Sequence, residues 1–156
     1  MSAADELRTR IRARGPISFA EFMEVALYGP DGFYADPPVG VGGHFVTSPH
    51  VHPIFAELLA SAIASSWSEM GEAGKPRVIE VGAGDGTLAA QLAPHVGAYV
   101  AVERSAAGRQ ALAERGIEAV EDLADLSDGG TAVIVANELL DNLPFDRVRA
   151  HADGLR

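Results

Sequence analysis

The fold of this chain is decided by residues 77–87, which read Arg77-Val78-Ile79-Glu80-Val81-Gly82-Ala83-Gly84-Asp85-Gly86-Thr87. A short apolar run gives way to three glycines at alternate positions and then to a helical pattern, which predicts a strand, a tight turn and a helix. Glycine is needed where the backbone takes a positive φ or where a ligand approaches too closely for a Cβ. The unpaired N–H groups at the start of the helix would point toward the same place. The turn therefore predicts a site for a nucleotide-like ligand.

An acidic residue after the next apolar run supports this site. Residues 98–102 are apolar and lead to Glu103, whose carboxylate can accept both hydroxyl hydrogens of a ribose. The glycine spacing is Gly-x-Gly-x-Gly, whereas dinucleotide sites carry Gly-x-Gly-x-x-Gly. An adenosine-type ligand is therefore favoured. A nicotinamide dinucleotide, bound by an oxidoreductase, is the minor alternative, and a purely structural turn before a helix is another.

Residues 80–86 resemble the first motif of the S-adenosylmethionine-dependent methyltransferases, in which an acidic residue and alternating glycines follow the first strand. The resemblance implies that S-adenosyl-L-methionine is the cofactor. The residues expected to hold it at this motif and at the next strand are Glu80, Gly82, Gly84, Asp85, Gly86 and Glu103.

The composition narrows the class of partner. The chain has 156 residues, 47% of them hydrophobic, which is enough for a packed core. Its net charge of −10 argues against nucleic acid, because phosphate binding needs an excess of Lys and Arg, and favours a cationic substrate. No apolar run approaches the roughly 20 residues of a membrane span, and no cysteine is present for a disulfide or a thiolate zinc site. We therefore expect no membrane association and a cytoplasmic location.

The first part of the chain reads as helical. Ser2 and Ser18 are expected to cap two helices that end near Gly15 and Gly29. A loop rich in Pro and Gly follows, and one helix is then expected from Ser48 to residue 70. Its Pro53 falls in the first turn or so, where proline is tolerated.

Three histidines in or after this loop raise the question of a metal site. His44, His50 and His52 are close in sequence, and neutral imidazoles are good metal ligands. However, no acidic residue lies beside them to complete a site, and histidines near a helix start often serve as hydrogen-bond partners. We therefore expect no metal.

Beyond residue 75 the pattern alternates strand and helix. Strands are expected at 77–82, 98–103, 117–120 and 131–136, and helices at 87–95 and 105–115. Such alternation predicts an α/β fold, Rossmann-like, with a parallel sheet and a site at the carboxyl ends of its strands. We expect residues 1–74 to form a helical and loop segment that packs on the cofactor site, and residues 75–156 to form the first part of the Rossmann-like domain.

Polar residues follow the third and fourth strands, where that site is expected. Asn137, Glu138 and Asp141 come after strand 131–136, and either carboxylate can hold a cationic group through charge-assisted hydrogen bonds. The alternative is a capped turn without function. Asp122 follows the third strand and can accept a hydrogen bond from an adenine amino group, although an ordinary surface charge explains it equally well.

The whole chain from Gly15 onward resembles the MidA-like methyltransferases, whose mitochondrial members are complex I assembly factors that methylate arginine on a partner subunit. Five segments carry the resemblance: Gly15-Pro16-Ile17-Ser18-Phe19-Ala20-Glu21-Phe22-Met23, Tyr28-Gly29-Pro30 with Gly32-Phe33-Tyr34, Gly43-His44-Phe45-Val46-Thr47-Ser48-Pro49, the glycine motif, and Asn137-Glu138-Leu139-Leu140-Asp141 with Leu143-Pro144. His44 stands where the family usually has an acidic residue.

This resemblance implies a protein substrate with arginine as the acceptor. It also implies that the loop carrying Gly43, Thr47 and Ser48 closes near the methyl donor. A guanidinium is never appreciably deprotonated in water, so the enzyme must orient one nitrogen and disperse charge onto carboxylates. Glu138 is the expected catalytic clamp, and Asp141 is the second candidate.

Members of this family are longer than this chain. Residues 145–150 alternate like the first arm of a hairpin, with a turn signal at Asp153-Gly154. We therefore expect a sheet truncated after its fourth strand, whose exposed edge favours a homo-oligomer. A non-catalytic fragment that binds a partner protein, as an assembly factor does, is the alternative function.

Overall fold

The computed structural model describes residues 2–35, 46–126, 129–152 and 154–155. The chain forms two compact units, one made of Met1–Asp36 with Leu140–Arg156 and the other of Pro37–Leu139. The boundaries of these units do not coincide with the expected division at residue 74. The helix that precedes residue 74 shares a hydrophobic core with the sheet, so contacts in space group it with the strands.

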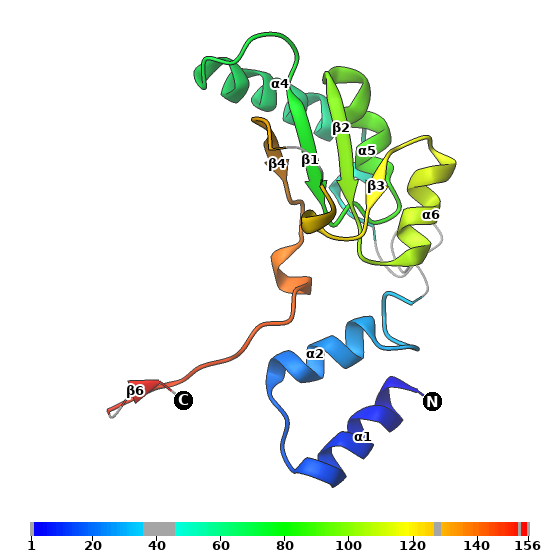
Figure 1. Cartoon of the computed structure of the whole chain (residues 1–156), viewed down its shortest axis with the longest axis vertical. Coiled ribbons are helices and arrows are strands. Elements are labelled where there is room, and N and C mark those ends of the chain that lie inside the picture. Colours follow the sequence, from blue (N-terminus) through cyan, green and yellow to red (C-terminus); the bar gives the residue numbers. More distant parts are fainter. Residues whose placement is uncertain (1, 36–45, 127–128, 153, 156) are drawn as a thin grey trace. The chain divides into compact units, whose positions relative to one another are not determined.

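The larger unit, Pro37–Leu139, is built on a parallel four-stranded sheet (Figure 1). The strands are β1 Arg77–Val81, β2 Ala98–Val102, β3 Ala119–Val120 and β4 Val133–Val135, in the order β3-β2-β1-β4. Glu80 of β1 lies in register with Ala101 of β2 and with Val135 of β4. The predicted alternation of strand and helix and the parallel sheet are therefore confirmed.

Helices cover this sheet and supply its core. Helices α4 Ile54–Glu69 and α5 Thr87–Leu92 pack with β1 and β4 around a cluster made of Ala56, Ile63, Val78, Leu88, Leu92, Val96 and Val135. Helix α6 Ala106–Glu114 contributes Leu112 to a second cluster, which contains three alanines, Ala83, Ala89 and Ala101. Both Leu92 and Leu112 are fully buried, which fixes α5 and α6 against the strands whose ends they follow.

The stretch after the Pro- and Gly-rich loop forms two helices where one is predicted. The expected single helix from Ser48 to residue 70 is wrong, because the structure has a short α3, Ser48–Val51, and then α4 from Ile54. His52 between them is extended, with φ −161° and ψ 139°. The ring of the following Pro53 disfavours helical dihedrals at the residue before it, so the helix cannot run through His52.

The smaller unit is made of the amino-terminal and carboxyl-terminal segments of the chain. It contains α1 Ala3–Arg14, α2 Phe19–Tyr28, a 3-10 turn η3 Leu140–Asn142, and a hairpin of β5 Ala150–His151 with β6 Gly154–Leu155. The predicted caps are confirmed, since Ser2 accepts from the N–H of Asp5 and Ser18 from that of Glu21. The hydroxyls of Tyr28 and Tyr34 each donate to Asn142 at 2.8 Å. Among the described residues, no helix has the length and apolar character that a membrane crossing needs.

Candidate functional site

The glycine turn after β1 adopts the backbone that its sequence predicts. Gly82, Gly84 and Gly86 have φ values of 77°, 58° and 76°, all in the left-handed region that L side chains rarely adopt. A Cβ at Gly82 would lie 2.7 Å from Leu139 Cδ1, and one at Gly86 would lie 2.8 Å from Leu112 Cδ2. A Cβ at Gly84 would meet nothing within 4 Å. The outer glycines are therefore needed for packing, whereas the middle one faces open space that a ligand can enter.

Glu103 is fixed beside this turn by backbone donors. Its Oε2 accepts from the N–H of Gly84 at 2.9 Å, and its Oε1 accepts from the N–H of Ser105 at 2.7 Å. A Cβ at Gly108, in the first turn of α6, would lie 2.6 Å from Glu103 Cγ. The carboxylate is thus held rigidly between the glycine turn and α6. A carboxylate has about four lone-pair positions, so Glu103 keeps acceptor capacity for ribose hydroxyls.

Glu80, the last acidic residue before the turn, is buried. It is 3% exposed, and its Oε2 accepts a 2.5 Å hydrogen bond from the hydroxyl of Tyr99 on β2. Burial raises the pKa of Glu80 to about 7, against the opposing effect of the Tyr99 hydrogen bond and with a further contribution from the negative charges of Glu103 and Asp85. Burial also raises the pKa of Tyr99 above its ordinary range. Glu80 therefore changes its charge near neutral pH.

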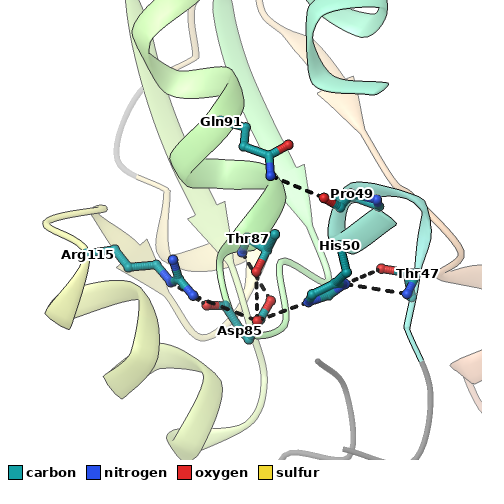
Figure 2. A network of polar contacts seen from close by, with 7 residues as sticks. All are labelled: Thr47, Pro49, His50, Asp85, Thr87, Gln91 and Arg115. Atoms are coloured by element: carbon teal, nitrogen blue, oxygen red, sulfur yellow. Dashed lines mark hydrogen bonds and ion pairs between the residues drawn. The ribbon is translucent and has the colours of Figure 1, made fainter. Parts of the chain in front are cut away.

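Asp85, inside the glycine turn, is the centre of a polar network (Figure 2). Its Oδ1 accepts from the N–H of Thr87 at 3.1 Å and its Oδ2 from the hydroxyl of Thr87 at 2.8 Å. The Nε of Arg115 donates to the Asp85 carbonyl at 2.9 Å. Partial burial alone would raise the pKa of Asp85, but the hydrogen bonds from Thr87 and His50 outweigh it and hold that pKa below its ordinary value.

Helix α3 joins this network from the other side. His50 Nε2 lies 3.1 Å from Asp85 Oδ2, and His50 Nδ1 lies 2.9 Å from the hydroxyl oxygen of Thr47. Gln91 of α5 donates to the Pro49 carbonyl at 3.1 Å, a contact that also appears in Figure 2. Sequence reasoning expected Thr47 at the site but gave His50 no part in it. The Thr47-x-x-His50 spacing, which allows a reciprocal cap of a helix start, is the signal that could have indicated this contact.

The other candidate residues of this region are His44, His52, Gly43 and Ser48. His52 Nδ1 accepts from the N–H of Ile54 at 3.0 Å, so this histidine hydrogen-bonds at a helix start as expected. His44 and Gly43 lie outside the described residues. Ser48, predicted to contact the cofactor, is exposed at the start of α3. No group of three or more metal-ligating side chains occurs in the part of the chain that the structure describes.

The end of β4 carries the expected acceptor-side residues. Asn137 is half-buried, and Glu138 is exposed with φ 52°, the one positive φ outside glycine among the described residues. Such a backbone costs about 1–2 kcal/mol in a residue with a Cβ, and observed strain of this kind clusters at functional sites. Asp141 lies in η3 of the smaller unit and is exposed.

Asp122 has a local structural contact. It follows β3, is exposed, and its Oδ1 accepts from the N–H of Ala124 at 2.9 Å, which caps the short turn Leu123–Asp125. This cap explains the residue type without a ligand. The adenine contact stays a prediction.

The carboxyl ends of β1 and β2 thus bring together Glu80, the three glycines of the turn, Asp85 and Glu103. The chain as a whole is similar to known proteins. Residues 58–156 match a family model described as "Putative S-adenosyl-L-methionine-dependent methyltransferase". The chain is 41% identical over 90 residues to the Drosophila melanogaster protein arginine methyltransferase NDUFAF7 homolog, mitochondrial. It is 39% identical over 93 residues to the Danio rerio protein arginine methyltransferase NDUFAF7, mitochondrial.

Solved structures are similar over more of the chain. A COG1565 superfamily member from Burkholderia thailandensis, bound to S-adenosyl-homocysteine, has a TM-score of 0.75 and 32% identity over 91% of this chain. The native structure of a COG1565 superfamily protein from the same organism has a TM-score of 0.71 and 31% identity over 98% of this chain. The match covers 42% of each of these two chains, and it covers only 21% and 22% of the Drosophila and Danio relatives.

These comparisons bear on two of the expectations. They favour the methyltransferase interpretation of the glycine turn over the nicotinamide alternative. The expected cytoplasmic location is corrected, because relatives from Drosophila, Danio and Homo sapiens are named as mitochondrial proteins. The composition argument failed because freedom from cysteine is compatible with more than one compartment.

Proposed function

The chain belongs to this family of S-adenosyl-L-methionine-dependent methyltransferases, and on that premise we propose that it forms the cofactor-binding part of a protein methyltransferase. The single observation that carries the proposal is the glycine turn. Three positive-φ glycines surround an open face at Gly84, whose N–H orients the Glu103 carboxylate at 2.9 Å. This arrangement fits a nucleoside, because ribose needs a fixed acceptor beside a backbone that carries no Cβ.

Each residue of the site would have its own role in binding the cofactor. Gly84 would leave room for the cofactor, while Gly82 and Gly86 give the turn the left-handed backbone that presents it. Glu103 would accept from its ribose, Asp85 would hold the turn through Thr87, and Glu80 is proposed as a further contact at the end of β1. Further contacts are proposed for Asp122, Asn137, Gly43, Thr47 and Ser48. When bound, S-adenosylmethionine supplies an electrophilic methyl group to an acceptor.

The acceptor that we propose is an arginine side chain of a protein. The relatives from Drosophila and Danio are named as protein arginine methyltransferases, and the net charge of −10 suits a cationic substrate. Glu138 would receive the guanidinium, since an exposed carboxylate can bind it through two hydrogen bonds and disperse its charge. Asp141 is the second candidate for this role. The homo-oligomer expected through a sheet edge also remains a proposal, with β4 as one edge of the described sheet.

A calorimetric titration with S-adenosyl-L-methionine tests the cofactor site. The chain offers a matched pair of variants, Gly84→Val and Gly74→Val, because both glycines have positive φ and a Cβ at either would meet nothing within 4 Å. Gly74 precedes β1 whereas the glycine turn follows it, so the two glycines lie beyond opposite ends of this strand. We expect saturable binding in the wild type and in Gly74→Val, and its loss in Gly84→Val. Absence of binding in the wild type, or equal binding in both variants, would contradict the proposal.

A further inference from the structure

Helix α3 is bound to the glycine turn through the side chain of His50. This side chain is 7% exposed and that of Asp85 is 23% exposed, so the contact between them is largely removed from water. The two residues are 35 positions apart in sequence, and Figure 2 shows the imidazole lying between Thr47 and Asp85. A hydrogen bond to a carboxylate in such a place is stronger than a surface pair of the same length.

The contacts of the imidazole determine which nitrogen carries the proton. The backbone N–H of Thr47 points at His50 Nδ1 at 3.4 Å, and a backbone N–H can only donate. Nδ1 is therefore the acceptor, and it also accepts from the Thr47 hydroxyl at 2.9 Å. Nε2 then carries the hydrogen and donates it to Asp85 Oδ2. The neutral Nε2–H tautomer satisfies all three contacts at once.

The Asp85 side chain is consequently held from several elements, including Arg115, whose Nη2 lies 3.8 Å from Asp85 Oδ2. Thr87, at the start of α5, donates to both carboxylate oxygens, and His50 donates to one of them from α3. Asp85 stands between Gly84 and Gly86, whose backbones have more freedom to lose on folding than those of other residues. Fixing the side chain between these glycines therefore restricts the orientation of the peptide groups that face the open side of the turn.

We propose that His50 is a positioning residue for the cofactor site, and that its Nε2–H holds the glycine turn, through Asp85, in the conformation that binds the donor. The inference rests on the proposed function, since it assigns a role within the same site. It also couples α3 to the cofactor. Because such coupling is reciprocal, a cofactor that favours the ordered turn also favours the contact of α3 with it.

Two substitutions separate this role from a local role in capping α3. His50→Gln places an amide nitrogen near the position of Nε2, so it keeps a donor for Asp85 and loses the acceptor for the Thr47 N–H. His50→Asn places an amide oxygen near the position of Nδ1, so it keeps that acceptor and loses the donor for Asp85. The affinity of each variant for S-adenosyl-homocysteine is measured by calorimetry, with thermal unfolding to confirm that the variant folds.

We expect His50→Asn to weaken binding about tenfold, the size of one charge-assisted hydrogen bond, and His50→Gln to stay within about twofold of the wild type. The reverse order, or equal affinities in all three proteins, would overturn the inference while leaving the proposed function intact. If the wild type itself does not bind, the proposed function fails and this inference fails with it.

A measurement on the free wild-type chain tests the tautomer independently of any ligand. The ¹⁵N chemical shifts of the imidazole distinguish a protonated ring nitrogen from an unprotonated one. We expect a protonated Nε2 and an unprotonated Nδ1 at neutral pH. An unprotonated Nε2 would overturn the inference, even if the asparagine variant failed to fold.

Discussion

The carboxyl ends of β1 and β4 lie next to each other in the sheet and differ in how firmly they are built. After β1, each glycine of the turn has a positive φ, and the neighbouring carboxylates of Asp85 and Glu103 accept from backbone N–H groups. β4 has only three residues and lies at the edge of the described sheet. It leads to an exposed Glu138 whose backbone is strained. Ile134 within that strand is 62% exposed.

Under the function proposed above, the two strand ends have different physical requirements, one for binding the cofactor and the other for receiving the acceptor. A cofactor site gains affinity when its geometry exists before binding, because the cost of ordering has already been met in folding. A carboxylate that must receive a large cationic side chain needs access instead, and access implies exposure. Substitutions at both strand ends and at the buried Glu80 test this contrast.

Gly86→Val tests how much the turn after β1 contributes to the free energy of unfolding. This glycine is buried with φ 76°, and an added Cβ would lie 2.8 Å from Leu112 Cδ2 and 3.1 Å from Arg115 Cδ. We expect a loss of about 3 kcal/mol in the free energy of unfolding, from left-handed strain together with overpacking. Urea denaturation measures it. Ile134→Ala on β4 is the control, and its loss is expected to stay within about 1 kcal/mol because that side chain is exposed. Equal losses would remove the contrast between the two ends.

The chemical role of the β4 end is tested by Glu138→Gln. The amide keeps the size of the side chain and removes the charge that would balance a guanidinium. We expect methyl transfer from labelled S-adenosyl-L-methionine to arginine-containing protein to fall about 100-fold, with the affinity for the donor unchanged. Asp141→Asn, which likewise keeps the size of its side chain, serves as the comparison for the second candidate. Full transfer by Glu138→Gln at unchanged donor affinity would exclude Glu138 as the clamp.

The buried Glu80 should make stability depend on pH. Its pKa is about 7 in the folded chain against an ordinary 4.5, so the folded state binds this proton more tightly than the unfolded state does. The stabilising contribution is therefore complete below about pH 4.5 and is lost as the pH rises through about 7. Relative to Glu80→Gln, the wild type should lose on the order of 2 kcal/mol in its free energy of unfolding between about pH 5 and pH 8. Urea denaturation at both pH values measures the difference, and a difference that does not change with pH would contradict the burial argument.

The smallest effect is expected for Tyr99→Phe, which removes the hydroxyl that donates to Glu80 at 2.5 Å. The free energy of unfolding should fall by about 1.5 kcal/mol at pH 8, where the carboxylate is charged and most needs a donor. At pH 5 the loss should be smaller, because the carboxyl group is then mainly neutral. A loss of the same size at both pH values would indicate that the ring packing matters rather than the hydrogen bond.

Much of the fold could be predicted because its signals are local. The glycines of the turn, the caps at Ser2 and Ser18 and the alternation of strand and helix each depend on residues within a few positions of one another. The break before α4 was also local, since Pro53 restricts the residue before it. The prediction of one continuous helix gave too little weight to that restriction, although the sequence contained it.

By itself, then, the sequence determined the positive-φ turn, the parallel α/β sheet and the acidic residues at its strand ends, because backbone sterics and hydrophobic periodicity act over short stretches. Only the tertiary structure decided which side chains meet. It joined His50 to Asp85 across 35 positions, fixed Glu103 on the N–H of Gly84, and buried Glu80 against Tyr99 until its pKa rose to about 7. These contacts depend on how helices and strands pack, and burial and the distance between charges exist only once that packing is complete.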